Sequence, residues 1–213
     1  MSHAHDHLVR LLAWLAGFEA AERRVHSQNG EDGVLEHLFG FVGAGPKNYI
    51  EFGVMSGRET NTRHLRKAHG WRGLMMDGGY RKPSINLQQE MVNVSNVVGL
   101  FRKYGFAPET ELDLLSVDTD CYDYWLTETV FSAGYRPRAI VNEVNAALTL
   151  APPAKISVPP PDDPRAGGRS RCFGSSEADR LSSWFGGSVS AFSSLYQRYN
   201  YSMVYCESTG VNC

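Results

Sequence analysis

Acidic residues and closely spaced glycines occur together at the end of one short apolar run. The run has the sequence Asn48-Tyr-Ile-Glu-Phe-Gly-Val-Met-Ser-Gly57 and ends in Glu51-x-Gly53-x-x-x-Gly57. Apolar residues followed by such glycines predict a buried strand that enters a tight turn, where the backbone approaches a ligand closely. Dinucleotide-binding folds use three glycines at this turn to receive a pyrophosphate. Here a carboxylate stands in the first glycine position, which favours a ligand with positive charge and hydroxyl or amino groups.

Four more acids follow other apolar runs, at Asp77, Asp118, Asp120 and Glu143. In a doubly wound sheet, ligands bind at the carboxyl ends of the strands, so we expect these acids to lie with Glu51 around one site. Asp118 and Asp120 point to the same side of an extended chain, where two carboxylates share either a proton or a cation. An Asx turn that caps the following helix is the alternative for Asp120.

Alternating strands and helices are predicted to position these acids. Apolar runs predict strands over residues 49–54, 73–78, 112–117, 138–144 and 201–206. Helices are predicted to begin within 27–34 and to cover 60–69, 122–132 and 188–200. This alternation favours a single doubly wound, Rossmann-like α/β domain with a mostly parallel sheet and helices on both faces. A chain of 213 residues suits one such domain, which we assign to residues 27–213.

Two other segments have a distinct composition. Residues 1–26 are assigned to a tail and an amphipathic helix packed on the sheet, because leucines recur there at helical spacing, at Leu8, Leu11, Leu12 and Leu15. The cluster of His3, His5 and His7 beside Asp6 is expected to be a disordered terminus rather than a metal site. Residues 151–171 are rich in proline and glycine and predict a surface loop inserted in the domain.

The overall composition excludes several classes of partner. The net charge of −2 argues against nucleic acid and anionic membranes, and no apolar run is long enough to span a bilayer. Four cysteines (Cys121, Cys172, Cys206 and Cys213) have no regular spacing, so we expect neither a disulfide framework nor a zinc site. A reducing, cytoplasmic location is the simpler interpretation. The sequence leaves the oligomeric state open.

Five segments, in order along the chain, carry a further pattern. They are Ser27-Gln-Asn-Gly-Glu-Asp-Gly33, Tyr49-Ile-Glu-Phe-Gly53, Gly70-Trp-Arg-Gly-Leu74, Asp113-Leu-Leu-Ser-Val-Asp-Thr-Asp120 and Tyr201-Ser-Met-Val-Tyr-Cys-Glu-Ser-Thr-Gly-Val-Asn212. The glycine turn is similar to motif I of class I S-adenosylmethionine-dependent methyltransferases. More narrowly, the five segments together resemble the FkbM-like methyltransferases, in the branch that opens with Ser-Gln-x-Gly-Glu-Asp-Gly.

The resemblance implies an S-adenosylmethionine-dependent enzyme that methylates a small-molecule or glycan hydroxyl. It implies that Glu51, Gly53 and Gly57 lie at the cofactor, Asp77 at its ribose and Asp118 near its methionyl end. The alternative for Asp77 is a turn-capping role before Gly78-Gly79. The resemblance also implies a final β-hairpin, whose last strand would lie beyond Cys213. Either the sequence is a truncated form or the protein functions without that strand.

Methyl transfer to a hydroxyl requires that the acceptor lose a proton. Asp118, Glu143 and Asp120 are the candidate catalytic residues, acting as a general base or at the acceptor. We expect no metal. The alternative is a magnesium ion bound by oxygen atoms of Asp118, Asp120, Glu143 and Asn145. A non-catalytic module that binds S-adenosylmethionine is the other function that the sequence allows, whereas a Rossmann oxidoreductase would need the absent three-glycine fingerprint.

Overall fold

A five-stranded, all-parallel sheet forms the centre of the protein, with the strand order β3-β2-β1-β4-β5. The computed structural model describes residues 2–119, 122–145, 186–210 and 212–213. The predicted doubly wound, Rossmann-like α/β fold is confirmed, as are four of the five predicted strands. The strands are β1 (Asn48–Phe52), β2 (Arg72–Asp77), β3 (Leu87–Gln89), β4 (Leu114–Val117) and β5 (Ala139–Asn142). The strand order reverses between β1 and β4, which is where such sheets bind ligands.

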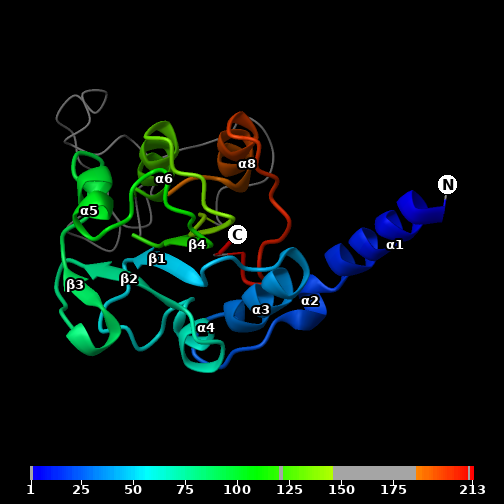
Figure 1. Cartoon of the computed structure of the whole chain (residues 1–213), viewed down its shortest axis with the longest axis horizontal. Coiled ribbons are helices and arrows are strands. Elements are labelled where there is room, and N and C mark those ends of the chain that lie inside the picture. The colour runs from blue at the N-terminus through cyan, green and yellow to red at the C-terminus, as the bar shows by residue number, and fades with distance from the viewer. Residues whose placement is uncertain (1, 120–121, 146–185, 211) are drawn as a thin grey trace, which may run out of the picture.

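Helices cover both faces of the sheet (Figure 1). On one face, Tyr49, Met75 and Leu114 pack against Leu35 and Leu65 of α3 and α4. The other face packs against α5, α6 and α8. The helices are α1 (Ser2–Ala16), α2 (Phe18–Ala21), α3 (Glu31–Val42), α4 (Arg63–Ala68), α5 (Val97–Lys103), α6 (Asp123–Ser132) and α8 (Val189–Arg198), with a 3₁₀ turn at Pro83–Ile85.

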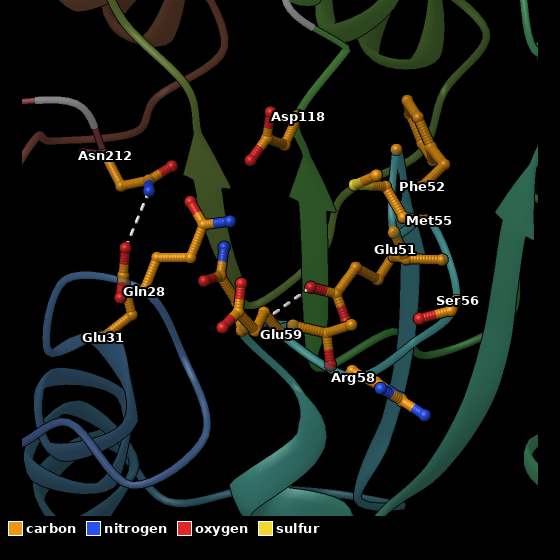
Figure 2. A pocket seen from close by; sticks show the side chains of 14 residues that line it. Gln28, Glu31, Glu51, Phe52, Met55, Ser56, Arg58, Glu59, Asp118 and Asn212 are labelled. Atoms are coloured by element: carbon orange, nitrogen blue, oxygen red, sulfur yellow. Dashed lines mark hydrogen bonds between the residues drawn. The ribbon is translucent and has the colours of Figure 1, made fainter.

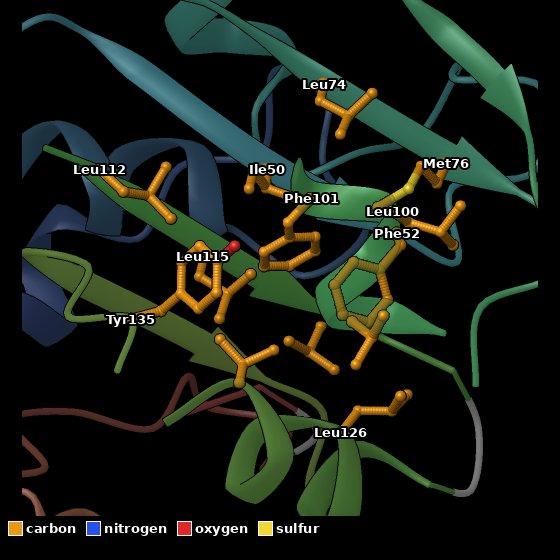
Figure 3. Packing of buried hydrophobic residues seen from close by; sticks show 13 residues of the cluster. Ile50, Phe52, Leu74, Met76, Leu100, Phe101, Leu112, Leu115, Leu126 and Tyr135 are labelled. Carbon is orange, nitrogen blue, oxygen red and sulfur yellow. The ribbon is translucent and has the colours of Figure 1, made fainter. Parts of the chain in front are cut away.

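The larger apolar core lies between the sheet and α5 and α6 (Figure 3). Ile50 and Phe52 of β1 point into it and contact a cluster that includes Phe101 of α5 and Leu126 of α6. Because successive side chains of a strand alternate between faces, Glu51 must point the other way, toward α3 and α4. Burial of both faces of β1 explains why its buried residues, from Tyr49 to Phe52, are apolar or aromatic except for Glu51.

The N-terminal helix forms, but it does not pack on the sheet as predicted. Helix α1 projects away from the rest of the molecule (Figure 1), and Leu8 and Leu12 are 52% and 56% exposed. Only its C-terminal part contacts the domain, where Trp14 stacks on Phe41 of α3. The prediction is wrong because α3 and α4 already cover this face, and the core cluster beneath them contains no residue of α1.

The prediction of a strand at 201–206 is also wrong. This segment is irregular, and the backbone groups at the end of β5 pair elsewhere. Asn142 N donates to Cys213 O at 2.8 Å and Cys213 N donates to Asn142 O at 3.0 Å, while Glu143 and Asn212 form an antiparallel bridge. In the described part of the chain, this short antiparallel pairing is all that corresponds to the expected final hairpin strand.

The expectation that the cysteines form no disulfide requires correction as well. Cys206 and Cys213 are joined, with their Cα atoms 4.0 Å apart. A turn brings them together, because Glu207 N donates to Asn212 O and Asn212 N donates to a carboxylate oxygen of Glu207. Cys121, Cys172 and the insert at 151–171 lie outside the described residues. None of the helices in the described part of the chain is both long and apolar enough to cross a bilayer.

Candidate functional site

The glycine turn after β1 has an unusual backbone conformation. Gly53, Met55 and Gly57 all have positive φ angles, of 79°, 47° and 71°. A Cβ atom on Gly53 would lie 1.4 Å from the carbonyl oxygen of Asp118, so only glycine fits between β1 and the end of β4. Met55 is 63% exposed, and its left-handed conformation is uncommon for a non-glycine residue. The turn therefore presents its backbone at the point where the strand order reverses.

A pocket of about 340 Å³ opens at this turn (Figure 2). Four segments of the chain form its walls: the loop before α3, the turn from β1 to α4, the end of β4, and the segment after α8. Its lining residues are Gln28, Glu31, Glu51, Phe52, Gly53, Val54, Met55, Ser56, Arg58, Glu59, Thr60, Asn61, Asp118 and Asn212. Of the predicted site residues, Glu51, Gly53 and Asp118 meet here.

Glu51 is a buried carboxyl group that holds the start of α4. Its Oε1 accepts a hydrogen bond from Asn61 N at 2.7 Å, and its Oε2 accepts from Thr62 N at 3.2 Å and from the Thr62 hydroxyl. Burial raises the pKa of Glu51 to about 7, against the opposing effect of these hydrogen bonds, and the negative charge of Asp118 raises it further. A carboxyl group that titrates near neutrality can respond to the charge of a ligand.

A second buried acid lies behind Asp118 and was not predicted. Asp123, in the first turn of α6, accepts a hydrogen bond from Thr119 N at 2.7 Å. Burial raises the pKa of Asp123 to about 7, and the negative charge of Asp118 adds to the rise. Its Oδ2 atom is buried without a hydrogen-bond partner. Asp123 therefore positions the residue next to Asp118. Its place at a helix start, where acids commonly act as caps, hides this role in the sequence.

Asp77 links two turns at the end of β2. Its Oδ2 accepts a hydrogen bond from Met55 N at 2.7 Å, and its Oδ1 accepts from Gly79 N at 2.8 Å. The turn-capping alternative is thus present in the structure, and it ties the glycine turn to β2. Asp77 does not line the pocket. Its predicted role at a ribose stays a prediction, since each carboxylate oxygen has lone pairs for a second donor.

The opposite wall of the pocket contains polar residues that the sequence interpretation assigned only to a helix start or to the resemblance. Glu31 Oε2 accepts a hydrogen bond from Asn29 N, and its Oε1 accepts from Asn212 Nδ2 at 2.7 Å (Figure 2). Asp32 holds the preceding loop, because its Oδ2 accepts hydrogen bonds from three successive amides beginning at Val25 N. The Oδ1 atom of Asn212 is buried and has no hydrogen-bond partner. The Ser27–Gly33 motif and the Cys206–Cys213 segment therefore meet at one wall.

The remaining predicted residues lie beside the pocket or outside the described chain. Glu143 follows β5, and its amide donates to Val117 O at 3.0 Å, which places it beside the end of β4, where Asp118 follows. Asn145 N donates to Gly187 O. Neither residue lines the pocket. Asp120 lies outside the described residues, so its catalytic role and the alternative magnesium site stay predictions. Gly57 closes the glycine turn, where its amide donates to Val54 O at 2.8 Å.

The charge of the pocket is strongly one-sided. Glu31, Glu51, Glu59 and Asp118 contribute carboxyl groups, whereas Arg58 is the one basic residue among the lining residues. Such a lining disfavours phosphates and other anions and favours a cation with hydrogen-bond donors. This agrees with the interpretation of the acidic glycine turn.

Comparisons with protein-family models, curated proteins and solved structures give no significant match to this chain. The geometry of the pocket therefore carries the functional argument.

Proposed function

We propose that the protein is an S-adenosylmethionine-dependent methyltransferase that acts on a hydroxyl group. The observation that carries this proposal is the acidic pocket at the reversal of strand order, between the glycine turn after β1 and Asp118 after β4. Doubly wound sheets bind ligands at this position, and the acidic lining suits a sulfonium and an α-amino group.

The residues around the glycine turn fit the cofactor chemically. Gly53 is an exposed lining residue of the pocket, and the space that a side chain would need there is filled by the backbone oxygen of Asp118. Glu51 and Asp118 would lie near the positive charge, and Asp77 would accept hydrogen bonds from the ribose hydroxyls through the lone pairs left by Met55 N and Gly79 N. S-adenosylmethionine supplies an electrophilic methyl group when it is bound. The contribution of the chain is to position the acceptor in line with it.

The acceptor hydroxyl must lose a proton during transfer. Asp118 is our first candidate for the base, with Glu143 beside it and Asp120 in the following loop. Glu31 and Asn212 form the far wall, where a carboxylate and a buried amide oxygen suit the hydroxyl groups of a small molecule or glycan. Magnesium is not needed in this scheme.

Calorimetric titration of the full chain with S-adenosylmethionine and with S-adenosylhomocysteine tests the binding step. A second assay, with an isotope-labelled methyl donor and a panel of sugar, glycan and catechol acceptors, tests transfer by mass spectrometry. We expect binding of both ligands and labelled product from at least one hydroxyl acceptor. Absence of binding contradicts the proposal. Binding without transfer to any acceptor favours the non-catalytic module.

A further inference from the structure

A second group of chemically active side chains lies away from the pocket, between α3 and α4. It consists of Glu36 on α3, His64 on α4 and His69 directly after α4. His69 Nε2 lies 2.8 Å from Glu36 Oε1, and His64 Nε2 lies 3.8 Å from the same oxygen. Among the described residues, this is the single group of three histidine, cysteine or acidic side chains whose ligand atoms all lie within 4.8 Å of one another.

The two imidazoles are held with their ligand atoms turned inward. Their ring centroids are 5.3 Å apart, and all three residues of the group are half-buried. The Nε2 atoms of His64 and His69 are both shielded from solvent. His69 Nε2 is paired with Glu36 Oε1, whereas His64 Nε2 has no hydrogen-bond partner, and leaving a buried polar atom unpaired is unfavourable.

We propose that Glu36, His64 and His69 bind a divalent transition-metal ion, with zinc as the best chemical match. Zinc forms bonds of about 2.0–2.1 Å to imidazole nitrogen and carboxylate oxygen, which puts tetrahedral ligand atoms about 3.3 Å apart. The two separations from Glu36 Oε1 lie on either side of this value. Two nitrogen donors among three ligands argue against magnesium and calcium, which prefer oxygen.

The two carboxylate oxygens of Glu36 have different neighbours. Arg23 contacts Glu36 Oε2, whereas both histidines face Oε1, so Oε1 is available to a metal while Arg23 orients the group. Ligating carboxylates are commonly held in this way by a second partner.

A metal at this position would connect α3 to α4. The residues immediately before α4, Asn61 and Thr62, hold the carboxyl group of Glu51 in the pocket. The metal would therefore support one wall of the pocket without contacting a ligand there. This inference is independent of the methyltransferase proposal, since it concerns binding of a metal alone.

Titration of the metal-free full chain with Zn²⁺, and with Co²⁺ as a spectroscopic probe, tests the site. All proteins in the test should have His3, His5 and His7 replaced by alanine, because the terminal histidines bind metals by themselves. We expect a single equivalent of Zn²⁺, a Co²⁺ spectrum of nitrogen and oxygen ligands, and a higher thermal unfolding midpoint with metal. His64→Gln and His69→Gln should each weaken binding by roughly tenfold or more.

The matched control is His37→Gln, which changes another half-buried histidine of α3 whose Nε2 atom contacts Trp14 O. It should leave the affinity unchanged. Nitrogen-detected NMR of the histidine rings gives a test that needs no variant at the site: Zn²⁺ should shift the Nε2 signals of His64 and His69. The proposal would be overturned if His64→Gln and His69→Gln bound Zn²⁺ as tightly as the protein with both histidines intact. Cobalt–thiolate absorption, or metal-induced shifts confined to other histidines, would overturn it as well.

Discussion

Asp118 is the residue whose charge the proposed reaction needs most directly. It follows β4, where Leu114, Leu115 and Val117 already supply the buried surface, and it faces the pocket. Asp118→Asn should therefore keep the fold, with a change in the free energy of unfolding within about 1 kcal/mol. It should lose most methyl transfer, because an amide supplies neither a base nor negative charge. The measurements are chemical denaturation and turnover.

The control for Asp118 is Glu109→Gln, which neutralises an exposed acid outside the pocket lining. It should change neither the free energy of unfolding nor the turnover. A folded Asp118→Asn protein with normal turnover would remove Asp118 from the reaction.

Asp77 tests how the cofactor is held. If its carboxylate accepts hydrogen bonds from the ribose, Asp77→Asn should weaken binding of S-adenosylhomocysteine by about 1–3 kcal/mol. The same variant also disturbs the contacts with Met55 N and Gly79 N, so affinity alone is ambiguous. A thermodynamic cycle that combines Asp77→Asn with a ligand lacking the ribose hydroxyls separates the two effects. Fully additive losses in that cycle would mean that Asp77 only supports the turn.

Glu51 gives the stability of the protein a defined pH dependence. Its pKa rises from an ordinary value of 4.5 to about 7 in the folded state, so the folded protein binds more protons than the unfolded chain between these values. Stability is therefore fully present below pH 4.5 and falls as the pH rises through about 7, by roughly 3 kcal/mol for this fully buried group. Denaturation at several pH values should show a smaller decline in Glu51→Gln than in the wild type. Parallel profiles for the two proteins would contradict this.

At the scale of elements, the turn between β1 and α4 depends on the absence of one side chain. Gly53→Ala would place a Cβ atom against the backbone oxygen of Asp118, so β1 and β4 must separate at the pocket. Gly70 has a similar φ of 72°, but no atom lies within 4 Å of a Cβ built there. Gly70→Ala should therefore lose only about 1–2 kcal/mol of stability, from backbone strain, and Gly53→Ala substantially more. Denaturant titration compares the two, and equal losses would contradict the close approach.

Sequence patterns predict the central elements well because those elements depend on local chemistry. Strands β1, β2, β4 and β5 consist of apolar runs buried between two helical layers, which is typical of a parallel sheet. β3 escapes prediction because Leu87 is the one fully buried residue among its three. The segment 201–206 resembles a strand in composition, yet the end of β5 pairs with Asn212 and Cys213 instead.

The residues of the candidate site also fall into those that local sequence patterns predict and those that only the tertiary structure brings together. Glu51, Gly53 and Asp118 are predictable, because an acid and glycines at strand ends have a direct physical meaning in this fold. Glu31 and Asn212 are separated by 181 positions, and their contact depends on the complete tertiary structure. Asp123 is hidden for another reason, since an acid at a helix start has an ordinary capping role that masks its burial.

At the scale of the whole molecule, the disulfide between Cys206 and Cys213 holds the segment that carries Asn212. It closes a short loop with a sequence separation of 7. Cys206→Ser should lower the free energy of unfolding by about 2 kcal/mol. It should also weaken binding of any ligand that contacts Asn212. The wild type in reductant should match the variant, and the variant should not respond to reductant. Identical stability of all these samples would contradict a role for the bond.

The contact between Glu31 and Asn212 has a consequence for synthesis of the chain on the ribosome. All five strands are encoded by residue 142, so a growing chain can assemble the sheet, the glycine turn and the Asp118 side of the pocket early. The opposite wall must wait until Asn212 is translated and free to reach the loop before α3. A product released before that residue would have the folded sheet and an incomplete pocket. A complete pocket therefore distinguishes a chain that has been translated through Asn212 from a shorter one, whereas the presence of the folded sheet does not.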